Sequence, residues 1–134
     1  MDLVIKNGTI VTTTESYQAD IGVVDETIAL IGRELSADEV IDASGMYVMP
    51  GGVDPHTHLE LPFMGSVSAD DFRTGTVAAA CGGTTTIIDF AIQGAGQTLR
   101  EALDIWLVKA AGKAAIDYGM HMAVGDMDDC LLYT

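Results

Sequence analysis

The pattern of hydrophobic residues changes at Pro50-Gly51-Gly52, and this change limits the possible folds more than any other feature. Before it, short runs rich in β-branched residues alternate with turn residues, which predicts β structure over residues 1–50. After it, strand and helix patterns alternate, which predicts a parallel α/β arrangement over residues 51–134. We therefore expect two domains with their boundary at residue 50.

The first domain reads as a series of short strands. Asn7-Gly8 lies between "LVIK" and "TIV" and predicts a hairpin, because Asn-Gly favours the positive φ angles of a type I′ turn. A second hairpin is predicted where "DET" separates "DIGVV" from "IALIG", and further strands are expected at residues 40–42 and 47–49. The segment holds no histidine, cysteine or glycine-rich phosphate loop, so we expect its role to be structural.

The second domain reads as β-α-β-α-β. A first helix is expected from Ser68, where "SADD" is a capping pattern, to Gly82-Gly83, and a second from the capping box "TLRE" at Thr98. Buried strands are expected at "TTTIIDF" and "YGMHMAV". One face of the second helix is apolar and comprises Leu99, Leu103, Trp106, Ala110 and Ala114. A closed (β/α)8 barrel needs eight βα units and ~250 residues, so this chain holds only the beginning of one.

Composition excludes several partners. The net charge of -14 would repel nucleic acid and anionic lipid, and no apolar run is long enough to span a membrane. The N-terminus has no basic segment or cleavage site typical of a signal peptide, so we expect a cytoplasmic protein.

Cys81 and Cys130 lack metal-site spacing and are expected to be reduced thiols, with Cys81 buried.

The stretch "GGVDPHTHLELPF" holds two of the three histidines of the chain. On an extended segment His56 and His58 project to the same side, whereas Thr57 projects to the other. Two imidazole nitrogens at this spacing can reach one divalent ion, and Pro55 places them where regular strand pairing ends. The carboxyl ends of parallel strands are also where active sites form in α/β folds. The stretch therefore predicts a metal site, the alternative being two exposed loop histidines.

The sequence resembles the dihydropyrimidinase and D-hydantoinase family of the amidohydrolase superfamily. The resemblance rests on "VMPGGVDPHTHLELPFMG", "ACGGTTTIIDF" and "IDYGMHMAV", and it extends from "IKNGTIV" to about Asp129. It implies a β-sandwich segment over residues 1–50, followed by the first three strands and two helices of an incomplete (β/α)8 barrel. It also implies that the chain is an N-terminal part of a longer enzyme, which forms tetramers in many members of the family.

The resemblance implies a two-zinc site in which His56 and His58 bind one ion. The other ligands of the family are a carboxylated lysine that bridges both ions, two later histidines, and an aspartate that acts as the general base. The chain does not include these residues, so it carries no catalytic residue of its own and is expected to be inactive alone. The implied reaction is hydrolysis of the cyclic amide of a dihydropyrimidine or hydantoin to an N-carbamoyl amino acid.

The segment after the histidines helps to choose among related reactions. Dihydroorotases and allantoinases carry an arginine close behind this motif, and no cation is present in residues 59–64. The family resemblance assigns Leu61, Phe63 and Met64 to the lining of the pocket for an uncharged cyclic ureide, although each could simply pack at the rim. The alternatives are an allantoinase-like or dihydroorotase-like enzyme and a non-catalytic relative similar to the response-mediator proteins.

Other polar residues near the motif have more than one interpretation. Asp54 and Asp89 could each orient an imidazole from behind. Glu60 is expected to be a solvated rim residue, since the family does not use this position as a ligand. His121 matches no family ligand and is expected to be a hydrogen-bonded histidine of the barrel.

Overall fold

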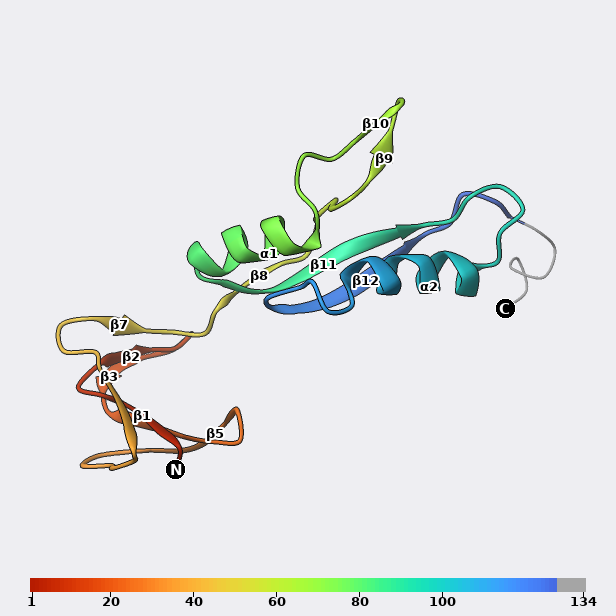
Figure 1. Ribbon diagram of the computed structural model, residues 1–134. Coiled ribbons are helices and arrows are strands. Elements are labelled where there is room, and N and C mark those ends of the chain that lie inside the picture. Colours follow the sequence, from red (N-terminus) through yellow and green to blue (C-terminus); the bar gives the residue numbers. More distant parts are fainter. Residues whose placement is uncertain (128–134) are drawn as a thin grey trace. The chain divides into compact units, whose positions relative to one another are not determined.

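The computed structural model describes residues 1–127, which divide between Pro50 and Gly51 into two compact units (Figure 1). The prediction for Cys130 lies outside the described residues. Cys81 is a free thiol, as expected, but it is exposed, so the prediction that it is buried is wrong. It is the last residue of the helix Phe72–Cys81, and its neighbours Ala80 and Gly82 are exposed as well.

The first unit contains two small sheets. The larger has the strand order β5-β4-β1-β6 and joins β1 (Leu3–Lys6), β4 (Asp20–Val24), β5 (Thr27–Gly32) and β6 (Glu39–Asp42). The smaller has the order β3-β2-β7 and joins β2 (Thr9–Val11), β3 (Ser16–Gln18) and β7 (Tyr47–Val48). The buried hydrophobic residues of this unit are Val4, Ile10, Ile21 and Ala43.

One of the two predicted hairpins is present. Strands β4 and β5 pair antiparallel around Asp25 and Glu26, whose φ angles of 46° and 63° are those of a type I′ turn. The prediction of a hairpin at Asn7-Gly8 is wrong, because β1 and β2 belong to different sheets. Asn7 does adopt a positive φ of 63°, but a Cβ on Gly8 would lie 2.5 Å from the Val48 side chain, so the chain turns here to pack against β7.

The second unit is built on a parallel sheet with the order β12-β11-β8, formed by β8 (Gly52–Asp54), β11 (Thr84–Ile92) and β12 (Asp117–Ala123). Two helices, α1 (Phe72–Cys81) and α2 (Leu99–Ala110), connect these strands. Both helices pack against β11 and against each other and share one core cluster, so they lie on the same face of the sheet. A short hairpin of β9 (Pro62–Phe63) and β10 (Ser66–Val67) precedes α1. The predicted α/β class is confirmed.

The core of the second unit lies between β11 and the two helices. It is formed by Phe72, Ile87, Ala91, Trp106 and Ala110, and alternate residues of β11 are buried from Ile87 onward. Side chains of a strand alternate between its two faces, so Ile87, Asp89 and Ala91 face the helices. Ile88 and Phe90 therefore face the opposite side of the sheet.

The two helix starts test the capping predictions. Helix α2 begins as predicted, with Thr98 as N-cap and Glu101 completing the capping box. Helix α1 begins three residues later than predicted, with Asp71 as N-cap and Thr74 completing the box. Ser68 instead donates its backbone N–H to the Leu61 carbonyl at 2.9 Å, which joins the two ends of the β9-β10 hairpin.

Candidate metal centre

The histidine segment continues the line of β8 after regular pairing has ended. Gly52 to Asp54 pair with β11, and Pro55 follows, which has no N–H to donate. Thr57 N–H then donates to the Ile88 carbonyl at 3.1 Å, which restores one bond of the parallel pattern beyond the proline. The segment is thus held against β11 at the carboxyl end of β8.

The two imidazoles converge. His56 Nε2 and His58 Nε2 lie 3.2 Å apart, and the rings are nearly perpendicular, with 86° between their planes. Two nitrogens that bind one tetrahedral zinc ion at about 2.0–2.1 Å are separated by about 3.3–3.4 Å. The donor set and its spacing therefore fit one divalent ion, and the predicted convergence of the two rings is present.

Phe90 lies beneath both imidazoles. Its ring centroid is 4.6 Å from that of His56 and 5.0 Å from that of His58. His121 contacts the same ring at 4.9 Å, and its Nε2 lies 3.0 Å from the Pro55 carbonyl oxygen. Because a carbonyl can only accept, His121 Nε2 carries the proton and is engaged. The expectation of a hydrogen bond at His121 is confirmed.

Neither Asp54 nor Asp89 contacts an imidazole. Asp54 Oδ1 accepts the backbone N–H of His56 at 3.1 Å, and Asp89 Oδ2 accepts the Thr57 hydroxyl at 2.9 Å and the Leu59 N–H at 2.8 Å. The suggestion that they orient the rings directly is therefore wrong. Both carboxylates hold the backbone of the segment: Asp54 binds the N–H of His56, and Asp89 lies on the side to which Thr57 and Leu59 project, away from the histidines.

The donors at this site are few. Among residues 1–127, no group of three or more histidine, cysteine or acidic side chains could together hold a metal ion. Two imidazoles fill half of the four positions of a tetrahedral zinc site. The chain thus presents a partial ligand set on a defined backbone.

Comparison with known proteins places this geometry in a family. The model of the amidohydrolase family matches residues 47–128, which include the histidine segment and the whole parallel sheet. The chain belongs to the amidohydrolase family. This agrees with the resemblance found in the sequence.

Amidohydrolases with a high similarity to this chain include a D-hydantoinase of Geobacillus stearothermophilus, 56% identical over 98% of this chain and 28% of the relative. A crystal structure of a D-hydantoinase superposes with a TM-score of 0.94 at 52% identity, over 99% of this chain and 29% of the other. The crystal structure of a dihydropyrimidinase from Brevibacillus agri superposes with a TM-score of 0.93 at 51% identity, over 99% of this chain and 29% of the other. The chain thus spans under a third of the length of these relatives.

The amidohydrolase segment after His58 separates into a buried and an exposed part. Leu61 is half-buried and packs against the core cluster. Phe63 and Met64 lie at the tip of the β9-β10 hairpin, where they are 64% and 91% exposed. The three predicted substrate contacts therefore do not form one surface within residues 1–127, and their roles stay predictions.

Glu60 is not the solvated rim residue that was expected. Its Oε1 accepts a bond from Lys113 Nζ at 2.7 Å, and only 19% of its side chain is exposed. Lys109 Nζ donates to the Glu60 carbonyl at 3.0 Å. Two cations, one from α2 and one from the turn after it, thus bind Glu60.

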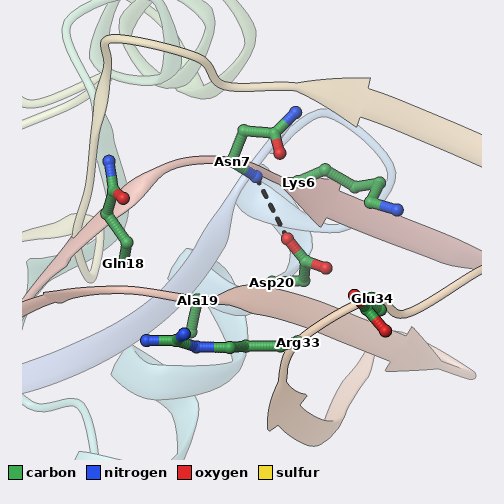
Figure 2. Close-up of a pocket in the computed structure, with 7 residues that line it drawn as sticks. All are labelled: Lys6, Asn7, Gln18, Ala19, Asp20, Arg33 and Glu34. Atoms are coloured by element: carbon green, nitrogen blue, oxygen red, sulfur yellow. Dashed lines mark hydrogen bonds between the residues drawn. The ribbon is translucent and has the colours of Figure 1, made fainter.

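A separate hollow of about 270 Å³ lies in the first unit of this amidohydrolase. Figure 2 shows its lining and the bond from Asn7 N–H to Asp20 Oδ1, which is 3.1 Å long. This bond, more than any other contact, lowers the pKa of Asp20, and a second N–H, from Leu35, acts in the same direction against the effect of burial. The residues that line it are Lys6, Asn7, Gln18, Ala19, Asp20, Arg33 and Glu34.

Sequence reasoning missed Phe90 and Thr57 as parts of the site. The available signal was the alternation of "IIDF", which puts Phe90 and Asp89 on opposite faces of the strand that follows the motif. The sequence did not reveal the register that brings this strand beside the histidine segment.

No helix among the described residues is long and apolar enough to cross a membrane.

Proposed function

We propose that the complete protein carrying this chain hydrolyses the cyclic amide of a dihydropyrimidine or hydantoin to an N-carbamoyl amino acid. The observation that carries the proposal is the convergence of His56 Nε2 and His58 Nε2 at 3.2 Å, in a chain about half identical to D-hydantoinases over nearly all its length. Because the chain covers 28% of the curated D-hydantoinase, the activity belongs to the complete protein.

We further propose that His56 and His58 hold one zinc ion of a two-zinc site, with a carboxylated lysine from beyond this chain as the bridging ligand. Zinc supplies a water of lowered pKa and polarises the carbonyl under attack. The part of this chain is to keep both imidazoles on one side of the segment with both Nε2 atoms available. Both imidazoles contact the Phe90 ring, and the Thr57 N–H donates to the Ile88 carbonyl. These contacts support that role.

The parallel sheet is proposed to be the first part of a (β/α)8 barrel. The order β12-β11-β8 places successive strands side by side, and both connecting helices cover one face, as successive βα units of a barrel do. The opposite face carries Phe90 and His121, which pair across β11 and β12. In a closed barrel that face becomes the interior, and the residues after β8 lie at its catalytic end.

The proposed substrate is an uncharged cyclic ureide. A substrate carboxylate would call for a cation, and residues 59–64 contain none. Lys109 and Lys113 approach this segment but both bind Glu60. Leu61, Phe63 and Met64 are proposed to line the pocket once the rest of the protein is in place.

The chain alone is proposed to be inactive and to bind zinc weakly. Two imidazoles leave half of the coordination positions of zinc to other donors and provide no general base. We also propose that the complete protein is a cytoplasmic homotetramer, and the tetramer rests on the family resemblance alone.

The test is ring opening by the complete protein after zinc loading, with dihydrouracil and hydantoin as substrates. We expect hydrolysis of at least one of them, and a loss of activity in H56A and H58A of about 100-fold or more, because each removes a direct ligand. The variant V108A, which alters an exposed side chain of α2, is the matched control. Zinc-loaded protein that opens neither ring would contradict the proposal.

A further inference from the structure

Strand β11 holds the histidine segment through three consecutive residues. Ile88 accepts the Thr57 N–H with its carbonyl, and Asp89 accepts the Thr57 hydroxyl and the Leu59 N–H with Oδ2. Phe90 packs under both imidazoles from the other face. The backbone on either side of His58 is therefore fixed from one side and the rings are supported from the other.

Asp89 stands out among these contacts because it is a carboxylate in the core. It is 1% exposed and faces the helices. Its Oδ1 accepts the N–H of Phe90 at 2.7 Å, so both oxygens are engaged by three donors in all. A carboxylate is costly to bury without such donors, and these three compensate for that cost.

We infer that Asp89 is a positioning residue for the metal site, which acts by holding Thr57 and Leu59 so that the His58 imidazole between them meets His56. The inference rests on the proposed function, in which the two histidines bind zinc. Asp89 contacts neither imidazole and reaches the site only through the backbone of the segment and the Thr57 hydroxyl. Its effect should therefore appear as a change in the affinity and geometry of the bound metal.

The contacts of Asp89 also predict the effect of replacing its carboxylate by an amide. In D89N only one terminal atom can accept, and the other becomes an NH2 group. Either the Phe90 N–H or the Leu59 N–H then faces a donor, whereas the Thr57 hydroxyl can turn to accept. Relieving either conflict moves the side chain at position 89 relative to Thr57 and Leu59, so we expect the separation of 3.2 Å between the two Nε2 atoms to change.

The experiment is a titration of the metal-free complete protein with Co²⁺, followed by the visible absorption of the bound ion. We expect D89N to bind Co²⁺ about 10–100-fold more weakly than the wild type, as is typical when a partner behind the ligands is lost, and with an altered spectrum. The matched control is D20N, which removes a carboxylate that is also buried and also accepts two backbone N–H groups, but in the first unit. It should leave Co²⁺ affinity within about twofold of the wild type.

Two variants at position 57 keep the test decisive if D89N does not fold. T57V removes the hydroxyl and should weaken Co²⁺ binding in the same direction, whereas T57S keeps the hydroxyl and should retain the affinity of the wild type. Unchanged affinity and spectrum in both D89N and T57V, or in T57V alone if D89N is unfolded, would overturn the inference. The failure of the proposed function is distinct, since then H56A and H58A would bind Co²⁺ as well as the wild type does.

Discussion

Lys113 Nζ donates to Glu60 Oε1 across 2.7 Å and so joins the turn after α2 to the second residue after His58. Glu60 Oε1 also accepts the N–H of Phe72, the first residue of α1, at 3.4 Å. The same carboxylate therefore connects the histidine segment with the start of α1 and with the turn after α2.

K113M should lower the free energy of unfolding by about 0.5–1 kcal/mol, because a half-exposed pair is screened by water. The loss should shrink in high salt, since the pair is partly accessible to ions. Urea unfolding at low and high ionic strength measures both effects. R100M is the control, because Arg100 and Asp104 form a highly exposed pair at 3.9 Å, and an equal or larger loss in R100M would contradict the expectation.

Gly75 in the middle of α1 is explained by Leu59. A Cβ on this glycine would lie 2.5 Å from Leu59 Cδ2, so the helix lacks a side chain where the residue after His58 packs. Alanine is favoured over glycine in a helix interior by about 1 kcal/mol, but G75A must also displace Leu59.

We therefore expect G75A to be more favourable in the L59A background than in the wild type, with a coupling of about 0.5–3 kcal/mol. A double-mutant cycle on the free energy of unfolding measures it. Additive effects of the two changes would show that Leu59 does not restrict position 75.

The start of α2 offers a test of the capping box. T98A should destabilise the protein by about 1 kcal/mol, because it removes the acceptor for the Glu101 N–H and a partner of the Glu101 carboxylate. T98S retains the hydroxyl and is the matched control. Thermal unfolding of the two variants should separate them, and equal stabilities would argue against a contribution from the cap.

The capping patterns also show which helix starts can be predicted from the sequence. "TLRE" offers one N-cap, Thr98, and α2 begins there as predicted. "SADD" offers several, and a local pattern cannot choose among them. The choice is made by a longer-range bond, because Ser68 pairs with Leu61 in the hairpin and leaves Asp71 as the cap.

The same limit explains the two turns of the first unit. Asn7 and the Asp25-Glu26 pair all have positive φ angles, so the local conformation was predictable at both places. Strand pairing at Asn7-Gly8 was not, because it depends on the contact of Gly8 with Val48, forty residues later. In the site, likewise, the spacing of His56 and His58 predicted their convergence, whereas the role of Asp89 required the register of β11.

The three histidines should differ in their effect on metal binding. H121Q should leave zinc affinity of the complete protein within about twofold of the wild type, because His121 Nε2 donates to the Pro55 carbonyl and a glutamine amide can still do so. H56Q and H58Q should weaken it at least about tenfold, because each removes a converging nitrogen. Competition with a chelator measures the three affinities, and an equal loss in H121Q would mean that this residue is a ligand.

Acid should destabilise the first unit through Asp20. The N–H groups of Asn7 and Leu35 favour the charged carboxylate and lower its pKa in the folded protein below the ordinary value of about 3.9. Since the folded pKa is the lower one, this contribution is fully present above the unfolded pKa, and it is lost as the pH falls through the folded pKa. D20N should therefore be less stable than the wild type at pH 7, and the difference should narrow as the pH falls from about 5 toward 2. Urea unfolding across this range measures it, with D104N, an exposed carboxylate of α2, as the control. A difference that stays constant over the whole range would mean that the charge of Asp20 contributes nothing to stability.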